Sequence, residues 1–591
     1  MGLENVKLHL VRSFEDAKAC ADWAIHGVNG GPGPQGALAI DTETTGLKWQ
    51  GADYVRTVQI GNAEHGWLLP KDLWWGLFLD IMRQHEGPID MMNAIFDYSM
   101  LEKAGVVVPK NRIKDVGVMS HVIEPHMSRA LKAQASRHVD PTAYAGQKFL
   151  DEAMEQNGWT WATIPWDYPW YWRYGALDPV LTYQLRKHHE PIVATHGAQY
   201  AVELETAYQW VAKDMMQNGV HVDLVHVENF LKQFRDYCVS VEKWVKAEYG
   251  ITPGSNQKVI EVLQRAGYEF TKRTEKQALS LDSDVLEGID HPLASAVLSR
   301  RQLQKMASTY LQFYLNHADS DSLIHPSLNT LGARTSRCSM SEPNFQNLPR
   351  TNTDTPGAKV VRNSVTARPG NCLMFCDFDQ IEMRGLAILS GDDGLRSAFH
   401  GPDDFFVTIA RQIFQDPHMV KSDPRRSPTK NAMYAKVYGA GIAKQAATAG
   451  VSFEQMLFIN QQLDAAYPKI EQYINYIYRL GMSQGFVQCP LTGRHHIADP
   501  GKEYALINYL IQGWAAAMFK QKQLELHAAG LGPYMILTVH DEVILDIPTE
   551  LVPDAARSLQ KIMNDTNYPV PITASVSYGP RWGEKSEWIY A

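Results

Sequence analysis

Four acidic residues in the first third of the chain have a spacing that suits metal-dependent chemistry on phosphate. Asp41 and Glu43 follow the apolar run 37–40, which predicts a buried strand, and side chains two residues apart on a strand share a face. Asp97 and Asp178 lie in two later segments. Two Mg²⁺ ions held by such carboxylates neutralise an anionic phosphate, activate a water molecule and stabilise the leaving oxygen. Asp97 or Asp178 alone would more often lie on a solvated helix face, and a DxE triplet can occur by chance, so only the set indicates hydrolysis of a phosphodiester.

Two of these acids follow a polar residue by four positions. Asn93 precedes Asp97 and Tyr174 precedes Asp178, and on a helix this spacing places each pair on one face. A tryptophan cluster between the two pairs could stack on single-stranded bases, but we interpret it as aromatic packing beneath the acidic site. The cluster consists of Trp159, Trp161, Trp166, Trp170 and Trp172.

A second possible metal site lies much later in the chain. Asp377 ends the apolar strand pattern 372–378, and Asp541 lies at the tip of a hairpin-like pattern within 534–547. If they are adjacent, these carboxylates could bridge two Mg²⁺ ions, one lowering the pKa of a hydroxyl nucleophile and the other holding a triphosphate. A charged hairpin tip is also common on protein surfaces, so Asp541 alone indicates little.

Between these two acids, cations and aromatic rings recur every four residues. Arg426, Lys430, Tyr434 and Tyr438 would form one stripe on a helix predicted over 427–438. Cations in the first turns suit a triphosphate, which the helix dipole also favours, and rings suit a base and a sugar. The alternative is a basic helix end packed on an apolar core.

The N-terminal motifs DxE, NxxxD and YxxxD, in this order, resemble those of the DEDDy 3′→5′ exonucleases. The resemblance implies that Asp41, Glu43, Asp97 and Asp178 hold two Mg²⁺ ions. It also implies that Tyr174 helps to orient the attacking water.

The later segments resemble motifs A, B and C of the family A DNA polymerases, the bacterial DNA polymerase I type. Motif A is DFDQIEMR over 377–384, against DYSQIELR in the family, and motif B, RxxxKxxx(F/Y)xxxYG, matches 426–439. Motif C, VHDE, is identical at 539–542. TSR at 335–337 and PNFQN at 343–347 resemble the family's primer–template contact TGR…PNLQN. With the exonuclease motifs, the resemblance covers nearly the whole chain in the family's order.

The polymerase resemblance implies a metal site and a sugar gate. Asp377, Phe378 and Asp541 would bind two Mg²⁺ ions, for which Mn²⁺ could substitute. Glu542 would be an accessory acid, and Glu382 would be the steric gate that excludes a ribose 2′-hydroxyl.

The same resemblance implies the substrate contacts. Arg426 and Lys430 would hold the triphosphate, and Lys430 could also donate a proton to pyrophosphate. Tyr434 would stack on the incoming nucleotide, and Tyr438 would close over the templating position. The other expected substrate contacts are Gln380, Arg337, Asn508, Gln512 and His540, the last four lining the primer terminus and the minor groove.

Three positions depart from the family pattern. The family often has a histidine in a DIH triplet that touches the triphosphate, whereas the matching stretch here, 403–405, reads DDF. Asp379 stands where the family usually has Ser, which adds negative charge near the metals. Tyr434 replaces the commoner Phe, and its hydroxyl should weaken discrimination against sugars that lack a 3′-hydroxyl.

Composition alone does not indicate a nucleic-acid-binding protein. The 591 residues carry a formal net charge of −9, with 45% hydrophobic and 20% charged residues, so any DNA contact must depend on local cations. None of the six cysteines forms a CxxC pair, which fits a reducing cytosol. The sequence predicts no signal peptide and no membrane span.

The resemblance implies a mixture of α/β and α+β architecture: an RNase H-like 3′→5′ exonuclease domain followed by a right-hand polymerase domain. The expected ranges are 1–198 for the exonuclease, 199–335 for the thumb, 336–394 for the palm with motif A, 395–484 for the fingers with motif B, and 485–591 for the palm with motif C.

The predicted function is template-directed DNA synthesis with proofreading. A short polymerase with an intact exonuclease resembles a bacteriophage replicative enzyme more than a repair enzyme, which implies work in the host cytoplasm. Expected partners are primer–template DNA, dNTPs and phage or host replication proteins, and the chain is expected to be a monomer. The alternatives are a nuclease whose polymerase half is inactive and a non-catalytic primer–template binder, against which the set of placed carboxylates argues.

Overall fold

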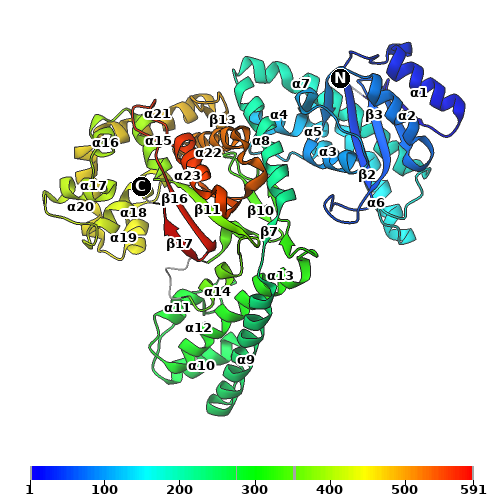
Figure 1. The fold of residues 1–591 in the computed structure, drawn as a ribbon. Coiled ribbons are helices and arrows are strands. Elements are labelled where there is room, and N and C mark those ends of the chain that lie inside the picture. Colours follow the sequence, from blue (N-terminus) through cyan, green and yellow to red (C-terminus); the bar gives the residue numbers. More distant parts are fainter. Residues whose placement is uncertain (1–2, 275, 350–354, 589–591) are drawn as a thin grey trace.

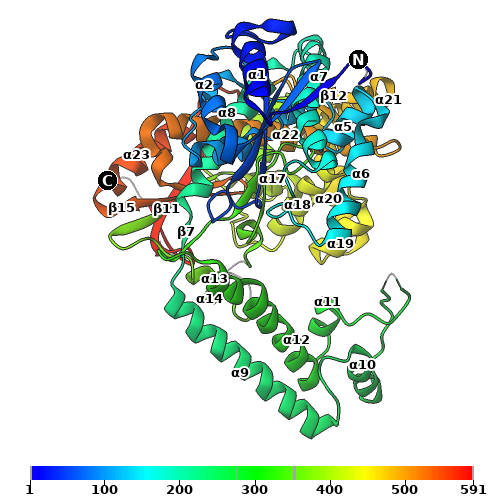
Figure 2. The ribbon, with the colours of Figure 1, turned by 90° about the vertical axis from the view of Figure 1, so that its right-hand side faces the viewer.

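Two sheet-based parts and a helical arm make up the structure (Figure 1). The computed structural model describes residues 3–274, 276–349 and 355–588. The N-terminal part (blue and cyan) lies at one end, and the second sheet (green and red strands) lies centrally between it and the yellow helices (Figure 1). The arm projects away from both sheets in both ribbon views (Figures 1 and 2).

The N-terminal sheet places the first two acids in its central region. Its strand order is β1-β4-β3-β2-β5-β6, and β2 is antiparallel to β3 and parallel to β5. β2 continues past the predicted apolar run to Thr44, so Asp41 and Glu43 lie within the strand, alternating with the buried Thr42 and Thr44. The strands are β1 (Lys7–Leu10), β2 (Leu38–Thr44), β3 (Val55–Gly61), β4 (His65–Pro70), β5 (Ile89–Met91) and β6 (Ile113–Asp115).

Helices cover this sheet, and one of them crosses most of its strands. α7 packs on strands β1 to β5. The helices are α1 (Phe14–His26), α2 (Lys71–Gln84), α3 (Ala94–Lys103), α4 (Val116–Ile123), α5 (Leu131–His138), α6 (Ala145–Asn157) and α7 (Pro169–Thr195), and α8 (Gln199–Asn218) leads into the rest of the chain.

The arm is built on the two long helices that the sequence predicts near 227–249 and 295–317. α9 (Leu224–Tyr249) ends at Gly250, whose φ of 68° is left-handed, and α12 (Pro292–Lys305) continues through a π-helical turn into α13 (Gln312–His317). An apolar cluster that includes Val245, Leu263 and Val297 gives the tip its own core. The tip also holds α10 (Asn256–Arg265) and α11 (Ser283–Glu287), and short strands at the base are β7 (Val220–His221), β8 (Leu323–Ile324), β9 (Ser327–Asn329) and β10 (Ser339–Ser341).

The second sheet is antiparallel, as predicted for the segments that carry Asp377 and Asp541. Its strand order is β14-β15-β11-β16-β17, with the buried strand β11 at its centre. α15, α22 and α23 belong to the same apolar core as the sheet. The elements are β11 (Asn371–Phe378), β14 (Met535–Val539), β15 (Glu542–Pro548), β16 (Ala574–Arg581), β17 (Glu584–Glu587), α14 (Ala358–Asn363), α15 (Ile381–Ser390), α22 (Leu506–Leu526) and α23 (Val552–Met563).

Between α15 and α22 the chain is mostly helical. The helix predicted over 454–483 is in fact two helices, because Pro468 cannot continue a helix and Tyr467 before it is non-helical (φ −132°, ψ 61°). The helix predicted over 503–529 is α22 flanked by a 3₁₀ and a π turn. The other elements are α16 (Asp393–Ala398), α17 (Phe405–Phe414), α18 (Arg426–Tyr438), α19 (Ile442–Ala449), α20 (Phe453–Ala466), α21 (Pro468–Gln484), β12 (Phe486–Gln488) and β13 (His495–Ile497).

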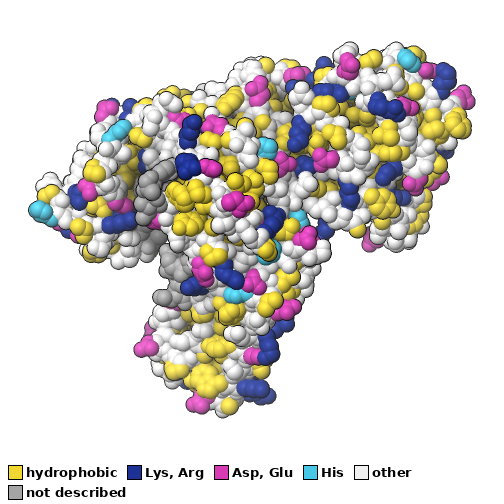
Figure 3. Space-filling view, viewed as in Figure 1, with side chains coloured by type: hydrophobic (Ala, Val, Ile, Leu, Met, Phe, Trp, Pro, Cys, Tyr) yellow, Lys and Arg dark blue, Asp and Glu magenta, His cyan; other side chains and the backbone are white. Residues whose placement is uncertain are grey.

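Charges of both signs are interspersed on the face that Figure 3 shows. This mixture agrees with the modest formal net charge of −9. Across the described ranges, no helix is both long and apolar enough to cross a membrane.

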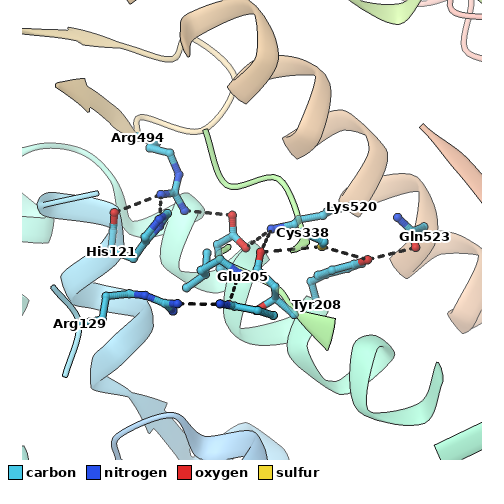
Figure 4. A network of polar contacts seen from close by, with 11 residues as sticks. His121, Arg129, Glu205, Tyr208, Cys338, Arg494, Lys520 and Gln523 are labelled. Carbon is cyan, nitrogen blue, oxygen red and sulfur yellow. Dashed lines mark hydrogen bonds and ion pairs between the residues drawn. The ribbon is translucent and has the colours of Figure 1, made fainter. Parts of the chain in front are cut away.

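A buried ion cluster joins the N-terminal part to the second sheet (Figure 4). Glu205 of α8 accepts from Arg494 (3.0 Å) and from Lys520 of α22 (2.6 Å), and these three side chains are only 2–3% exposed. Arg494 also lies 2.8 Å from Nδ1 of His121 in α4, and Lys520 donates to the carbonyl of Thr330 at 2.7 Å. Segments far apart in the chain are therefore held together by ion pairs that are almost entirely withdrawn from the surface.

We expect Glu205→Ala to destabilise the joint between the two parts. The substitution leaves two buried cations without their carboxylate, and removing one partner of a buried ion pair typically costs about 3–5 kcal/mol. Thermal unfolding and limited proteolysis of the full chain would measure the loss. Glu203→Ala, an exposed acid on the same helix, is the matched control. Equal melting temperatures for the two variants would contradict this role of Glu205.

Two candidate active sites

Three of the predicted N-terminal acids converge in space. β2 supplies Asp41 and Glu43, and α7, which packs across it, supplies Asp178. One carboxylate oxygen from each lies within 4.8 Å of the others. This all-oxygen set fits a divalent cation of the Mg²⁺ or Mn²⁺ type.

Asp97 comes from a third element and is held beside these acids by hydrogen bonds. It lies on α3 and is buried, and its carboxylate accepts hydrogen bonds from the backbone N–H of Thr42 (2.9 Å) and its hydroxyl (2.6 Å). Thr42 lies between the two acids of β2, so these bonds fix Asp97 beside them. The predicted helical pairing of Asn93 with Asp97 is wrong: Asn93 caps the helix in a left-handed conformation (φ 61°), which the Asp115 carboxylate supports by accepting from the Asn93 N–H (3.2 Å).

Burial and mutual repulsion shift the titration of these acids. Desolvation, followed by the neighbouring carboxylates, raises the pKa of Asp41 well above its ordinary value. Desolvation and then Asp178 raise the pKa of Glu43 to about 8. Desolvation also raises the pKa of Asp97 to about 7, against the opposing hydrogen bonds from Thr42. A carboxylate set that is costly to ionise gains strongly from a bound cation.

Tyr174 lies on α7 one turn before Asp178, as its spacing predicts, and the structure adds a lysine that sequence reasoning missed. Lys132 of α5 forms an ion pair with Asp178, and its Nζ lies 4.3 Å from the centroid of the Tyr174 ring. Lys132 is 46 residues from Asp178, and no motif marks it. Only the packing of α5 against α7 brings it there.

The tryptophan cluster packs, as we interpreted it. Four of its members pack with Tyr171 and Leu150 into one apolar cluster, and Trp170 instead stacks on Phe149 (ring centroids 4.6 Å apart). The four are Trp159, Trp161, Trp166 and Trp172.

The second site is assembled by strand register. Asp377, the penultimate residue of β11, lies directly opposite Glu542, the first residue of β15. Asp541 occupies the turn between β14 and β15, where His540 has a left-handed φ of 58°. The N–H of Phe378 donates to the carbonyl of Asp541 (3.3 Å), which draws the turn onto the end of β11. Residues about 160 positions apart thereby share one edge of the sheet.

The carboxylates of the second site also repel one another, and their pKa values are raised. Desolvation, then Asp541 and Glu542, raise the pKa of Asp377 to about 8, although part of its side chain reaches solvent. Desolvation raises the pKa of Asp541 to about 6. Lys585 of β17, which sequence reasoning also missed, lies 2.5 Å from Glu542 and acts against this rise at Asp377. Carboxylate oxygens are the ligands that Mg²⁺ and Mn²⁺ prefer, so this pair of acids also suits such a cation.

The predicted stripe on α18 exists, and its first cation is paired. Arg426 binds Asp404 with two hydrogen bonds of 2.8 and 2.7 Å, while Asp404 also caps the N-terminus of α17. Lys430 lies over the Phe406 ring (5.7 Å), which also neighbours Tyr434 (5.9 Å). The ring of Phe406 and the carboxylate of Asp404 therefore face the stripe, whereas Phe405 between them stacks on Phe399 (ring centroids 4.0 Å apart).

Glu382 is fixed by two partners. It forms an ion pair with Arg337 and accepts from the hydroxyl of Tyr438 (2.9 Å), to which Gln512 also donates (3.4 Å). Gln380 precedes α15 with a left-handed φ of 56°. Asn508 lies on α22, the helix that also carries Gln512.

Asp379 is held by two hydroxyl groups. Its two oxygens accept from the hydroxyls of Thr573 and Ser575, each at 2.8 Å. These hydroxyls belong to β16 and the segment before it, and no motif pointed to them. The extra negative charge of Asp379 still acts on the site, because it contributes to the raised pKa of Asp377 after burial, Asp541 and Glu542.

The family is decided by a sequence profile. The profile of DNA polymerase family A matches residues 226–584. The chain belongs to DNA polymerase family A. It is 28% identical over 578 residues to the DNA polymerase of Mycobacterium phage D29, covering 93% of each chain. It is 26% identical over 580 residues to that of Mycobacterium phage L5, covering 92% of this chain and 93% of the relative.

Further relatives include bacterial enzymes. DNA polymerase I of Chloroflexus aurantiacus is 30% identical over 443 residues, which are 70% of this chain and 46% of that enzyme. This family A polymerase shares its fold with the POL domain of Pol1 from M. smegmatis, solved in complex with DNA primer-template and dNTP. The TM-score is 0.79 at 20% identity, with 98% of this chain and 99% of that chain covered.

The raised pKa values predict how pH affects the metal-free polymerase. A carboxylate whose pKa is higher in the folded state stabilises the fold fully below its unfolded pKa and loses this contribution as pH rises through the folded value. For Glu43 that window runs from 4.5 to about 8. In EDTA, the melting temperature should therefore fall between about pH 6 and about pH 8, and added Mg²⁺ should raise it more at the higher pH.

Thermal melting at both pH values, with EDTA or Mg²⁺, would measure this effect. Glu43→Gln should flatten the pH dependence, whereas Glu155→Gln, an exposed acid on α6, should leave it unchanged. The same pH slope in Glu43→Gln and wild type would contradict the assignment.

Proposed function

We propose that this family A polymerase extends a primer 3′-hydroxyl at the Asp377–Asp541 site and excises nucleotides from the 3′ end at the Asp41–Asp178 site. The supporting observation is that one chain holds two separate carboxylate sets, each assembled from distant segments. We further propose that it replicates a phage genome, which its likeness to the polymerases of phages D29 and L5 supports.

We propose functional names for the parts of the fold. Residues 1–198 form the exonuclease domain and 199–335, which include the projecting arm, form the thumb. Residues 395–484 form the fingers, and 336–394 with 485–591 form the palm. This division is supported by the hydrogen bond from Tyr438 of α18 to Glu382 of α15 (2.9 Å), because α15 begins shortly after Asp377.

For synthesis, Asp377 and Asp541, with the Phe378 carbonyl, would hold Mg²⁺, which when bound neutralises triphosphate charge and lowers the pKa of the primer hydroxyl. Lys430 would contact the triphosphate and donate a proton to the pyrophosphate. Glu542, paired with Lys585, would support the cluster from the adjacent strand.

For substrate selection, Arg426 would contact the triphosphate with the guanidinium that Asp404 orients. Tyr434 would stack on the base, and Tyr438 would cover the templating position. Glu382 would exclude the 2′-hydroxyl. Gln380 would also contact the nucleotide, and Arg337, Asn508, Gln512 and His540 would line the primer terminus and the minor groove.

For excision, Asp41, Glu43, Asp97 and Asp178 would hold Mg²⁺, which when bound activates water and stabilises the leaving 3′-oxygen. The phenol of Tyr174 would orient that water. Its pKa is raised by burial and by Asp178, so it remains a neutral hydrogen-bond donor at neutral pH.

A labelled-primer assay on a primed template with Mg²⁺ tests both sites. Wild type should extend the primer with dNTPs and shorten it without them. Asp541→Ala should lower extension by at least roughly 10³-fold and spare shortening, and Asp41→Ala should do the reverse, because each removes a metal carboxylate from one site only. Shortening without any extension by wild type would instead support a nuclease with an inactive polymerase half.

The rigid placement of Glu382 predicts sugar selection. Glu382→Ala should raise incorporation of ribonucleotides relative to deoxyribonucleotides by at least about tenfold, because it removes the bulk that excludes the 2′-hydroxyl. Glu382→Gln keeps this bulk and is the matched control. Single-nucleotide kcat/KM values for both sugars would measure the ratio, and an unchanged ratio in Glu382→Ala would contradict the gate.

A further inference from the structure

Lys132 is a buried cation among the carboxylates of the proposed exonuclease site. Its side chain is 7% exposed, it pairs with Asp178, and its Nζ lies 4.3 Å from the Tyr174 ring centroid. Asp178 and Tyr174 lie one turn apart on α7, so a single ammonium contacts both. Burying a lysine ammonium is costly unless a partner of opposite charge compensates it, and here the carboxylate of Asp178 is that partner.

Lys132 is the cation placed to hold this acidic set together. Four carboxylates face the site: Asp41, Glu43 and Asp97 besides its partner Asp178. The other cation that acts on Glu43 is Arg56, but its guanidinium donates to the carbonyls of Trp161 (2.5 Å) and Ile164 (2.7 Å). An ammonium ion paired directly with a carboxylate both offsets repulsion and occupies an oxygen that a metal would use.

We propose that Lys132 is a positioning residue of this site: it fixes Asp178 and Tyr174 on α7 before metal binds, and it competes with the divalent cation for Asp178. The inference rests on the proposed exonuclease function for its catalytic meaning. The ammonium lies against the ring face and thereby fixes the phenol that would orient the water. The contacts of Lys132 with Asp178 and Tyr174 follow from the packing of α5 on α7 and are not marked by a sequence motif.

Lys132→Met tests the proposal, because methionine keeps an apolar stem of similar length and removes the charge. The metal-free protein should melt at a lower temperature, since the carboxylates lose their counter-cation. Mn²⁺ should bind more tightly, by at least about fivefold, because its competitor is gone. The kcat for primer shortening at saturating Mn²⁺ should fall, because Tyr174 loses its neighbour. Lys132→Arg, which keeps the charge, should show a smaller change in Mn²⁺ affinity.

Mn²⁺ binding is measured by electron paramagnetic resonance in an Asp377→Ala/Asp541→Ala background, so that the polymerase site does not contribute. Lys148→Met, an exposed lysine of α6 in the same domain, is the matched control. Primer extension by Lys132→Met in the otherwise unchanged chain confirms that the variant folds. If Lys132→Met does not fold, Lys132→Gln, which keeps a hydrogen bond to Asp178, replaces it with the same expected change in Mn²⁺ affinity.

The outcomes separate this proposal from the proposed exonuclease function. Tighter Mn²⁺ binding and a lower metal-free melting temperature, with a reduced kcat, support the role of Lys132. The same binding and melting changes in a protein whose wild type never shortens a primer would support Lys132 as the counter-cation and overturn the exonuclease function. Mn²⁺ affinity and melting equal to those of Lys148→Met would overturn the proposal, whatever the activity.

Discussion

Mutual repulsion between clustered carboxylates is the constraint on which both sites depend. Each site gathers acids that a protein would ordinarily keep apart, and the fold must hold them together before any cation arrives. The structure meets this constraint with directional bonds and with one lysine at each site. Thr42 fixes Asp97, Lys132 contacts Asp178, and Lys585 contacts Glu542. The cost of this arrangement appears as the raised pKa values of the acids, and a divalent cation relieves it.

The same logic explains why strands and helices carry most of these acids, and why the turn that holds Asp541 is hydrogen-bonded to the end of β11. Strand register sets Asp377 opposite Glu542, and a displacement by one residue would turn one of these side chains to the other face of the sheet. At the first site, β2 and α7 play the equivalent part for Asp41 and Asp178. The buried cluster around Glu205 extends this rigidity to the joint between the two parts (Figure 4).

Sequence reasoning predicted the elements whose chemistry is local. The two-residue period of β2, the four-residue stripe of α18 and the hairpin that carries Asp541 all follow from short-range patterns. It failed where a tertiary contact decides the outcome. Asn93 lies outside its helix because the Asp115 carboxylate stabilises a left-handed turn, which no spacing reveals. The position of Asp404 just before the apolar stretch 405–407 could have predicted that it caps a helix, but not that it binds Arg426.

The residues that escaped prediction share a physical property. Lys132, Lys585 and the partners of Asp379 are all contributed by elements other than those that carry the motifs, and each acts by compensating a charge. Motifs record the groups that must touch the substrate, whereas charge compensation can come from any neighbouring element with suitable reach. Where a fold clusters several acids, the cations that compensate them should therefore be sought on the neighbouring helices and strands. The search should start at the carboxylate that has the fewest other compensating contacts. At the first site that carboxylate is Asp178, whose pKa is raised by burial although Lys132 acts against the rise.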